Sequence, residues 1–220
     1  MILTSSVAAI YGANLPAGKT AFDETIWTDV VHPVGRLAYT KSKTLAEKAA
    51  WDYIEAEARE LEPTTINPVL VTGVPLDKHF GSSVSVIQRI LNGKDPMLPD
   101  ISFSIVDVKD VAEMHVKAIE LDAAKGQRFV ASTATLSFVQ IAKSLKASFA
   151  NRKFPTVQAP NILVRFLALF DADIKAVLPA LGSHMPVSAA KAQSVLGMKF
   201  IGADESLRET AAYLIDNGFR

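Results

Sequence analysis

The sequence contains no cysteine among its 220 residues. This absence excludes disulfide bonds, catalysis by a thiolate, and zinc or iron–sulfur sites built on cysteine. It also fits a reducing compartment, where disulfides are rare. The four histidines are scattered without metal-binding spacing, so we expect no metal site.

An excess of charge of either sign is also lacking. Lys and Arg together number 23, as do Asp and Glu, so no long-range attraction draws the chain to nucleic acid or an anionic membrane. No apolar run approaches the roughly 20 residues that span a bilayer. The apolar start, Met1–Ile10, has no basic region and is interrupted by Thr4–Ser6, which is atypical of a signal peptide. We expect a cytoplasmic protein without a nucleic-acid or membrane partner.

Helix and strand patterns alternate along the chain. Apolar and β-branched runs predict strands, and apolar residues at helical spacing predict helices. We expect strands at 1–6, 64–71, 102–108 and 128–131, and helices at 38–60, 84–91, 111–121, 137–149, 188–196 and 204–217. The repeat that predicts the first helix is Leu45, Ala46, Ala49, Ala50, Tyr53 and Ile54. Strands that alternate with helices favour an α/β fold with a parallel sheet.

Tyr39 and Lys43 lie four residues apart, at the start of the predicted helix at 38–60. Residues i and i+4 share one face of a helix, so the phenol and the ammonium can point at the same small volume. A nearby positive charge favours the phenolate form, and such a tyrosine can exchange a proton with an alcohol or a carbonyl. The spacing alone is a weak signal, because Tyr-x-x-x-Lys occurs by chance on many helices.

Ser6 ends the first predicted strand. Ligands of open α/β sheets bind outside the carboxyl ends of the strands, where the Ser6 hydroxyl can donate to or accept from a substrate oxygen. Ser6, Tyr39 and Lys43 then form a proton-transfer triad, with Tyr39 as the acid or base. Ser5 is the alternative for the serine role, because the two adjacent hydroxyls leave the register open.

Several runs of residues together resemble a known superfamily. They are Leu3–Gly12 (LTSSVAAIYG), Tyr39–Trp51 (YTKSKTLAEKAAW), Asn67–Gly73 (NPVLVTG), Val106–His115 (VDVKDVAEMH) and the tail Leu196–Ala211. The chain resembles the extended short-chain dehydrogenase/reductase superfamily, also called the NAD-dependent epimerase/dehydratase superfamily. The likeness is to its branch that contains dihydroflavonol reductase, and it covers essentially the whole sequence.

The resemblance implies an oxidoreductase that transfers a hydride from NADP(H) or NAD(H) to a ketone or aldehyde. The catalytic residues that it implies are Ser6, Tyr39 and Lys43. The cofactor-binding residues that it implies are Ser5, Tyr39, Lys43, Pro68 and Val71. Dehydratase members usually carry an acidic pair just after the strand hydroxyl, and Val7-Ala8 stands there instead, so a dehydratase is disfavoured.

The loop that opens members of this family is missing from the sequence. It is a Gly-x-x-Gly-x-x-Gly run that holds pyrophosphate at a helix N-terminus, whereas the 11 glycines here are scattered. We therefore expect the C-terminal portion of a Rossmann-type doubly wound parallel sheet plus a small α/β substrate-binding region. Residues 1–75 should form the partial Rossmann, catalytic portion. Residues 76–220 should be mainly substrate-binding, with 101–121 returning to the Rossmann core.

The resemblance places the variable substrate region at His79, Phe80 and the stretch 155–185, which should form short helices. Met97, Phe166 and Phe170 are expected in the core rather than in a pocket. The pattern does not decide which residues of this region face a substrate.

Two alternatives to the reductase stay open. The serine pair followed by Tyr11-Gly12 is also similar to sugar-nucleotide epimerases of the same superfamily. The second alternative is that the chain, which lacks the glycine loop, is a non-catalytic, truncated remnant with a structural or partner-binding role. The partner expected for the reductase is a small carbonyl substrate. A second copy of the chain or a complementing N-terminal fragment would cover the open edge of the sheet.

Overall fold

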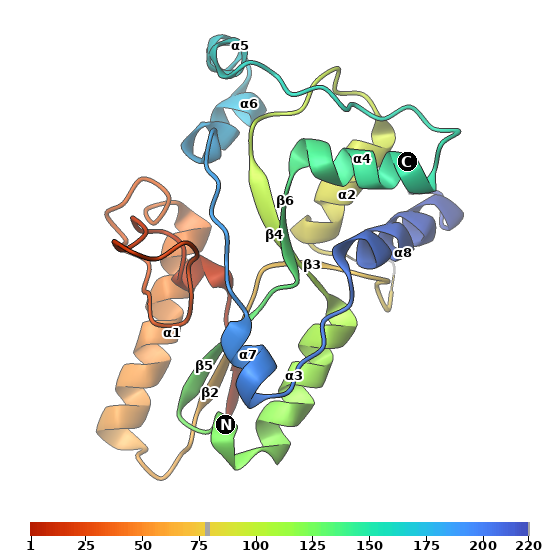
Figure 1. Cartoon of the computed structure of the whole chain (residues 1–220). Coiled ribbons are helices and arrows are strands. Elements are labelled where there is room, and N and C mark those ends of the chain that lie inside the picture. The colour runs from red at the N-terminus through yellow and green to blue at the C-terminus, as the bar shows by residue number, and fades with distance from the viewer. Residues whose placement is uncertain (78–79, 220) are drawn as a thin grey trace. The chain divides into compact units, whose positions relative to one another are not determined.

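The computed structural model describes residues 1–77 and 80–219 and divides them into two compact units (Figure 1). The first unit contains Met1–Val69, Lys109–Thr133 and Met185–Phe200. The second contains Leu70–Val108, Ala134–His184 and Ile201–Arg220. The chain therefore passes several times between the units, and each is described by itself.

The first unit is built on a parallel sheet in the order β1 (Ile2–Thr4), β2 (Thr64–Pro68) and β5 (Gln127–Ala131). All five residues of β2 are buried, as is typical of a central strand of a parallel sheet that is covered on both faces. Helix α1 (Ala38–Glu57) lies on one side of this sheet and α3 (Val108–Glu120) on the other (Figure 1). The unit is completed by η1 (Val7–Ala9), η2 (Asp122–Ala124) and α7 (Ala190–Val195).

The second unit has a mixed sheet in the order β3 (Leu70–Thr72), β4 (Ser102–Asp107) and β6 (Ala134–Ser137), in which β4 and β6 are antiparallel. Apolar faces of α2 (Ser82–Asn92), α4 (Phe138–Ser148) and α8 (Ala203–Asp216) form its core with the sheet (Figure 1). Ser137 and Gln140 form a capping box that starts α4. The remaining short helices are α5 (Asn161–Leu167), α6 (Ala172–Val177) and η3 (Leu178–Ala180).

The α/β architecture with a parallel sheet agrees with the prediction, but two elements differ from it. The predicted strand 64–71 is split into β2 and β3, which belong to different sheets. β2 ends at Pro68, which has no N–H to continue a ladder. The strand β6 was not predicted, because its four residues are only half-buried and carry little pattern.

The segment 101–121 is shared by the two units, since β4 belongs to the second and nearly all of α3 to the first. The division by role, with 1–75 catalytic and 76–220 mainly substrate-binding, stays a prediction, because packing does not show what each unit binds. Across the described ranges, no helix is both long and apolar enough to cross a membrane.

The buried face of α1 differs from its apolar repeat. Leu45, Ala49 and Tyr53 of that repeat are exposed. The inward residues include Thr40, Thr44 and Glu47. The Thr44 hydroxyl donates to the Thr40 carbonyl at 2.8 Å, which satisfies its hydrogen-bonding capacity within the helix. Polar residues with partners can therefore replace apolar residues on a buried helix face.

Candidate active site

Ser6 lies where the first strand leads into η1. The Ser5 N–H donates to the Ile66 carbonyl at 2.8 Å, which extends the pairing of β1 with β2 by one step. Ser6 is the N-cap of η1, and its Oγ accepts the Ala8 N–H at 3.2 Å. The Ser6 hydroxyl is therefore fixed at the carboxyl end of β1, the edge of the sheet at which such folds bind ligands.

Tyr39 and Lys43 lie next to that edge, on the first turns of α1. The Tyr39 hydroxyl donates to Ser6 Oγ at 3.5 Å, a long hydrogen bond that a substrate oxygen could replace. The Tyr39 side chain is 60% exposed and so can be reached from solvent. Lys43 is half-buried one turn further along, and its ammonium has no hydrogen-bond or ion-pair partner in the described part of the chain.

The two adjacent serines point to different partners. The Ser5 hydroxyl donates to the buried Glu47 carboxylate, whereas the Ser6 hydroxyl meets Tyr39. Of the two candidates for the serine role, the structure brings Ser6 and not Ser5 to the phenol.

The other two predicted cofactor residues, Pro68 and Val71, belong to different units. Pro68 ends β2 and pairs with Ala131, at the same carboxyl edge as Ser6. Val71 is in β3 of the second unit, where it pairs with Val106 and is half-buried. The structure therefore gathers Ser6, Tyr39, Lys43 and Pro68 on the first unit.

A buried polar network beneath this edge was not predicted. Glu47 Oε1 accepts Arg128 Nε at 2.7 Å, and Glu47 Oε2 accepts Asn67 Nδ2 at 2.6 Å as well as the Ser5 hydroxyl. Asn67 Nδ2 also donates to the Ser6 carbonyl at 3.1 Å. The network ties α1 to all three strands of the parallel sheet, so it holds Ser6 in register with α1.

One signal in the sequence could have revealed Glu47. Thr40, Thr44 and Glu47 recur at helical spacing on one face of α1, and that face packs inward. A carboxylate on a buried helix face, such as that of Glu47, needs a buried counter-ion, and the Arg128 guanidinium is that counter-ion.

The loop before α1 packs over η1 through Thr28. The Thr28 hydroxyl donates to the Ala8 carbonyl at 2.7 Å and accepts the Gly12 N–H at 2.9 Å. Close by, Gly35 lies against the chain at Asp29, so that a Cβ on Gly35 would stand 1.8 Å from the Asp29 carbonyl oxygen. This loop therefore needs glycine at position 35 to reach its place beside the site.

We expect Gly35→Ala to lower the free energy of unfolding by about 1–3 kcal/mol, because the loop must shift to admit the methyl group. Urea unfolding followed by circular dichroism measures this. Gly202→Ala is the control, since nothing lies within 4 Å of its Cβ position and its φ of −63° suits any residue. Its expected cost is about 1 kcal/mol or less. Equal losses in both variants would contradict the packing argument.

Burial raises the pKa of Tyr11, with nearby Tyr39 adding to the effect, while a hydrogen bond with Thr40 opposes it. Tyr11 thus stays a neutral phenol near neutral pH beside the candidate site.

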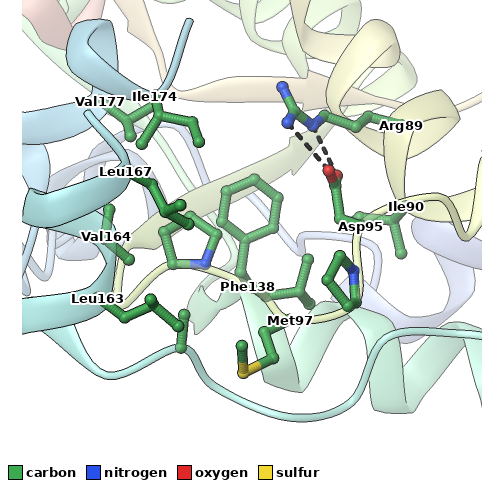
Figure 2. A pocket seen from close by; sticks show the side chains of 14 residues that line it. Arg89, Ile90, Asp95, Met97, Phe138, Leu163, Val164, Leu167, Ile174 and Val177 are labelled. Atoms are coloured by element: carbon green, nitrogen blue, oxygen red, sulfur yellow. Dashed lines mark hydrogen bonds and ion pairs between the residues drawn. The ribbon is translucent and has the colours of Figure 1, made fainter. Parts of the chain in front are cut away.

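The second unit has an apolar cavity of about 180 Å³, shown in Figure 2. The Phe138 ring lies at its centre, with Leu167 and Val164 of α5 on one side and Met97 on another (Figure 2). The Arg89–Asp95 ion pair, 2.7 Å from Nε to Oδ2, borders it. The cavity suits an apolar group.

The expectation that Met97, Phe166 and Phe170 lie in the core is wrong. Met97 lines the cavity rather than the core, and Phe166 and Phe170 are exposed and pack edge to face on each other. Phe80 packs against Phe219. His79 lies outside the described residues.

Within the described ranges, no group of three or more His, Asp or Glu residues is arranged to hold a metal ion. The groups that the first unit brings together are a hydroxyl, a phenol and an ammonium: Ser6 and Tyr39 can hold or protonate an oxygen, and Lys43 can supply positive charge beside it.

The chain is similar in sequence and in fold to known proteins. No family model matches the sequence. The chain is 31% identical over 221 residues to a cinnamoyl-CoA reductase from Medicago truncatula, over 100% of this chain and 61% of the relative. A crystal structure of the yeast methylglyoxal/isovaleraldehyde reductase complexed with NADPH matches with a TM-score of 0.74 at 25% identity, over 100% of this chain and 64% of that one.

A UDP-glucose 4-epimerase from Thermotoga maritima also matches, with a TM-score of 0.69 at 21% identity, over 98% of this chain and 63% of that one. That likeness concerns the fold alone. The chain spans about three fifths of the length of the relatives it matches. These matches place the chain in the extended short-chain dehydrogenase/reductase superfamily.

Proposed function

We propose that the chain supplies the proton-handling site of an NAD(P)H-dependent reductase of ketones or aldehydes. The observation that carries the proposal is the meeting of Tyr39 and Ser6 at the carboxyl end of β1, with the Lys43 ammonium one turn away. The relatives that support it are reductases by name, the cinnamoyl-CoA reductase and the methylglyoxal/isovaleraldehyde reductase.

The roles follow from the donors present. Ser6 donates a hydrogen bond to the substrate carbonyl oxygen and holds it beside the phenol. Tyr39 gives its proton to that oxygen as the carbonyl becomes an alcohol, and the Lys43 charge favours the phenolate that this leaves. The reduced nicotinamide, when bound, supplies the hydride to the carbonyl carbon and is itself oxidised. Solvent then returns a proton to Tyr39.

The residues fit one end of the cofactor. Lys43 is unpaired in the described part of the chain and Pro68 lies at the same edge, which supports the proposal that these two residues contact the nicotinamide and its ribose. The sequence contains no glycine-rich loop for the pyrophosphate. The proposed cofactor is NADP(H) or NAD(H), and we propose that groups outside these 220 residues bind its pyrophosphate.

The fold alone does not separate this proposal from the sugar-nucleotide epimerase, since an epimerase also matches it. The reductase is favoured because the relative at 31% identity is a reductase. A non-catalytic role is the other alternative. Measured reductase activity distinguishes the reductase from both alternatives. The longest product that the gene encodes should consume NADPH at 340 nm with an aldehyde or ketone from a panel that includes methylglyoxal. No consumption with any member would overturn the proposal.

We expect low-micromolar NADPH to shift the melting temperature of these 220 residues by less than about 2 °C. A complete site saturated at 100 times its dissociation constant would add about 2.7 kcal/mol, and so a shift of roughly 5–10 °C. Differential scanning calorimetry with and without NADPH makes the comparison, and NADP⁺ serves as a second ligand. A shift of the larger size would show that the cofactor site is complete without the glycine loop.

A second copy of the chain and a complementing N-terminal fragment are the proposed ways of covering the open edge of the sheet. Analytical ultracentrifugation distinguishes them, since only the first gives a dimer of the chain alone.

A further inference from the structure

The first unit has a pocket that lies away from the candidate active site. Its volume is about 300 Å³, and its walls include both tryptophans of the sequence, Trp27 and Trp51, together with Arg128, Lys191 and Glu24. Trp51 is 12 residues beyond Tyr39 on α1, which is about 18 Å along the helix. Arg128 lies near the start of β5, the outer strand, and not at its carboxyl end. We call this site the tryptophan pocket.

Two N–H donors of the tryptophan pocket are buried without a partner. Arg128 is 8% exposed, and it donates through Nε to Glu47 and through Nη1 to the carbonyls of Glu24 at 2.8 Å and Ile26 at 3.0 Å. Its Nη2 and the Trp51 Nε1 have no hydrogen-bond partner among the described residues. Each buried donor left unpaired costs about 1–3 kcal/mol, so an acceptor that reaches either nitrogen after a small movement of the surrounding side chains would be stabilising.

The walls of the pocket suit a planar ring. The Arg128 guanidinium stacks over the Trp27 ring with Cζ 3.7 Å from the centroid, and Lys48 Nζ lies 5.4 Å from it. The Trp51 indole forms another wall. Aromatic side chains favour stacked or edge-to-face contact with another ring.

The charges in the pocket favour a negative group on that ring. Burial lowers the pKa of Lys191, whose ammonium lies 4.9 Å from the centroid of the Phe129 ring, so this cation is poorly solvated. Glu24 is the opposing charge, but its Oε1 already accepts the Val130 N–H at 2.8 Å, and burial raises its pKa. An added carboxylate would stabilise the Lys191 ammonium and accept from the unpaired donors.

We propose that the tryptophan pocket binds a small aromatic carboxylate, with its ring against the two indoles and its carboxylate oxygens accepting the Trp51 and Arg128 N–H groups beside Lys191. This site is separate from the proposed reductase chemistry and does not depend on it.

Benzoate is the probe, and the indole N–H groups are the reporters. The chain has two tryptophans, so a ¹⁵N-labelled sample gives two indole cross-peaks, which Trp27→Phe assigns. We expect benzoate to shift the Trp51 cross-peak saturably, to lower field, at millimolar concentration or below. Benzyl alcohol lacks the charge and acetate lacks the ring, and at the same concentrations neither should reproduce the shift.

Variants separate a built site from general anion binding. We expect Lys191→Gln to weaken benzoate binding at least fivefold, and Lys199→Gln, which removes an exposed lysine of the same unit, to leave it unchanged. Trp51→Phe keeps an aromatic ring in the pocket wall but removes the indole N–H donor, and it should also weaken benzoate binding. In this variant the Trp27 cross-peak reports the binding. Three outcomes would overturn the proposal: a benzoate shift that does not saturate, a shift that acetate reproduces, or a shift that Lys199→Gln reduces as much as Lys191→Gln. None of these readouts requires reductase activity.

Discussion

Replacing Tyr39 with phenylalanine should lower the turnover of NADPH-dependent carbonyl reduction by about 10²–10⁴-fold, the size of a general-acid contribution. The change removes one hydroxyl, whose only hydrogen bond within residues 1–77 and 80–219 is the 3.5 Å bond to Ser6. Because the side chain is 60% exposed, the fold should be unaffected. Steady-state kinetics of the longest gene product, with the best substrate of the panel, measures the loss.

Tyr53→Phe is the matched control, since Tyr53 is on the same helix and is 62% exposed. It should leave turnover unchanged. The two serines give a further contrast: Ser6→Ala should reduce turnover, whereas Ser5→Ala should act on stability through Glu47. Full turnover in Tyr39→Phe would remove Tyr39 from the mechanism. Equal kinetic losses in the two serine variants would contradict the assignment of Ser6.

Glu47→Ala should lower the free energy of unfolding by about 3–5 kcal/mol, because it leaves a buried guanidinium without its counter-ion. The Glu47 side chain is fully buried and that of Arg128 is 9% exposed, so bulk water solvates neither charge in the folded chain. Asn67 and Ser5 lose an acceptor at the same time. Urea unfolding of the 220-residue chain, followed by circular dichroism and by tryptophan fluorescence, gives the value.

The exposed Glu113–Lys117 pair on α3 provides the control. Glu113→Gln should cost about 1 kcal/mol or less, because an exposed ion pair contributes little. A double-mutant cycle sharpens the test: Glu47→Ala combined with Arg128→Met should cost less than the sum of the two single changes, since the second removes the unpaired charge. Additive losses would mean that the two side chains do not act as a pair.

Part of the candidate site is local in the sequence, since Tyr39 and Lys43 are one helical turn apart. Ser6 lies 33 residues before Tyr39, and the predicted strand end and the family resemblance together selected it. The structure brings the Ser6 and Tyr39 hydroxyls within 3.5 Å, and their catalytic role stays a prediction. The same reasoning could not choose between Ser5 and Ser6. That choice depends on where each hydroxyl finds a partner, and Glu47 lies 42 residues from Ser5.

The rest depended on contacts between distant residues. Arg128 is 81 residues from Glu47, and no local pattern links them. Their pairing makes a polar face of α1 the buried one, while the apolar repeat that predicted this helix stays largely exposed. The division of one predicted strand into β2 and β3 was also not predicted, because residues 64–71 form a single run rich in β-branched residues.

By itself, the sequence determined the α/β class through its periodicity and the family through its resemblance to known motifs, and it predicted Ser6, Tyr39 and Lys43 as the proton-transfer residues. Only the tertiary structure decided which serine meets Tyr39, which charges are buried together and where the two tryptophans enclose a pocket. Burial decides these matters, since a polar group removed from water must find its partner wherever the fold brings one, however far away it lies in the sequence.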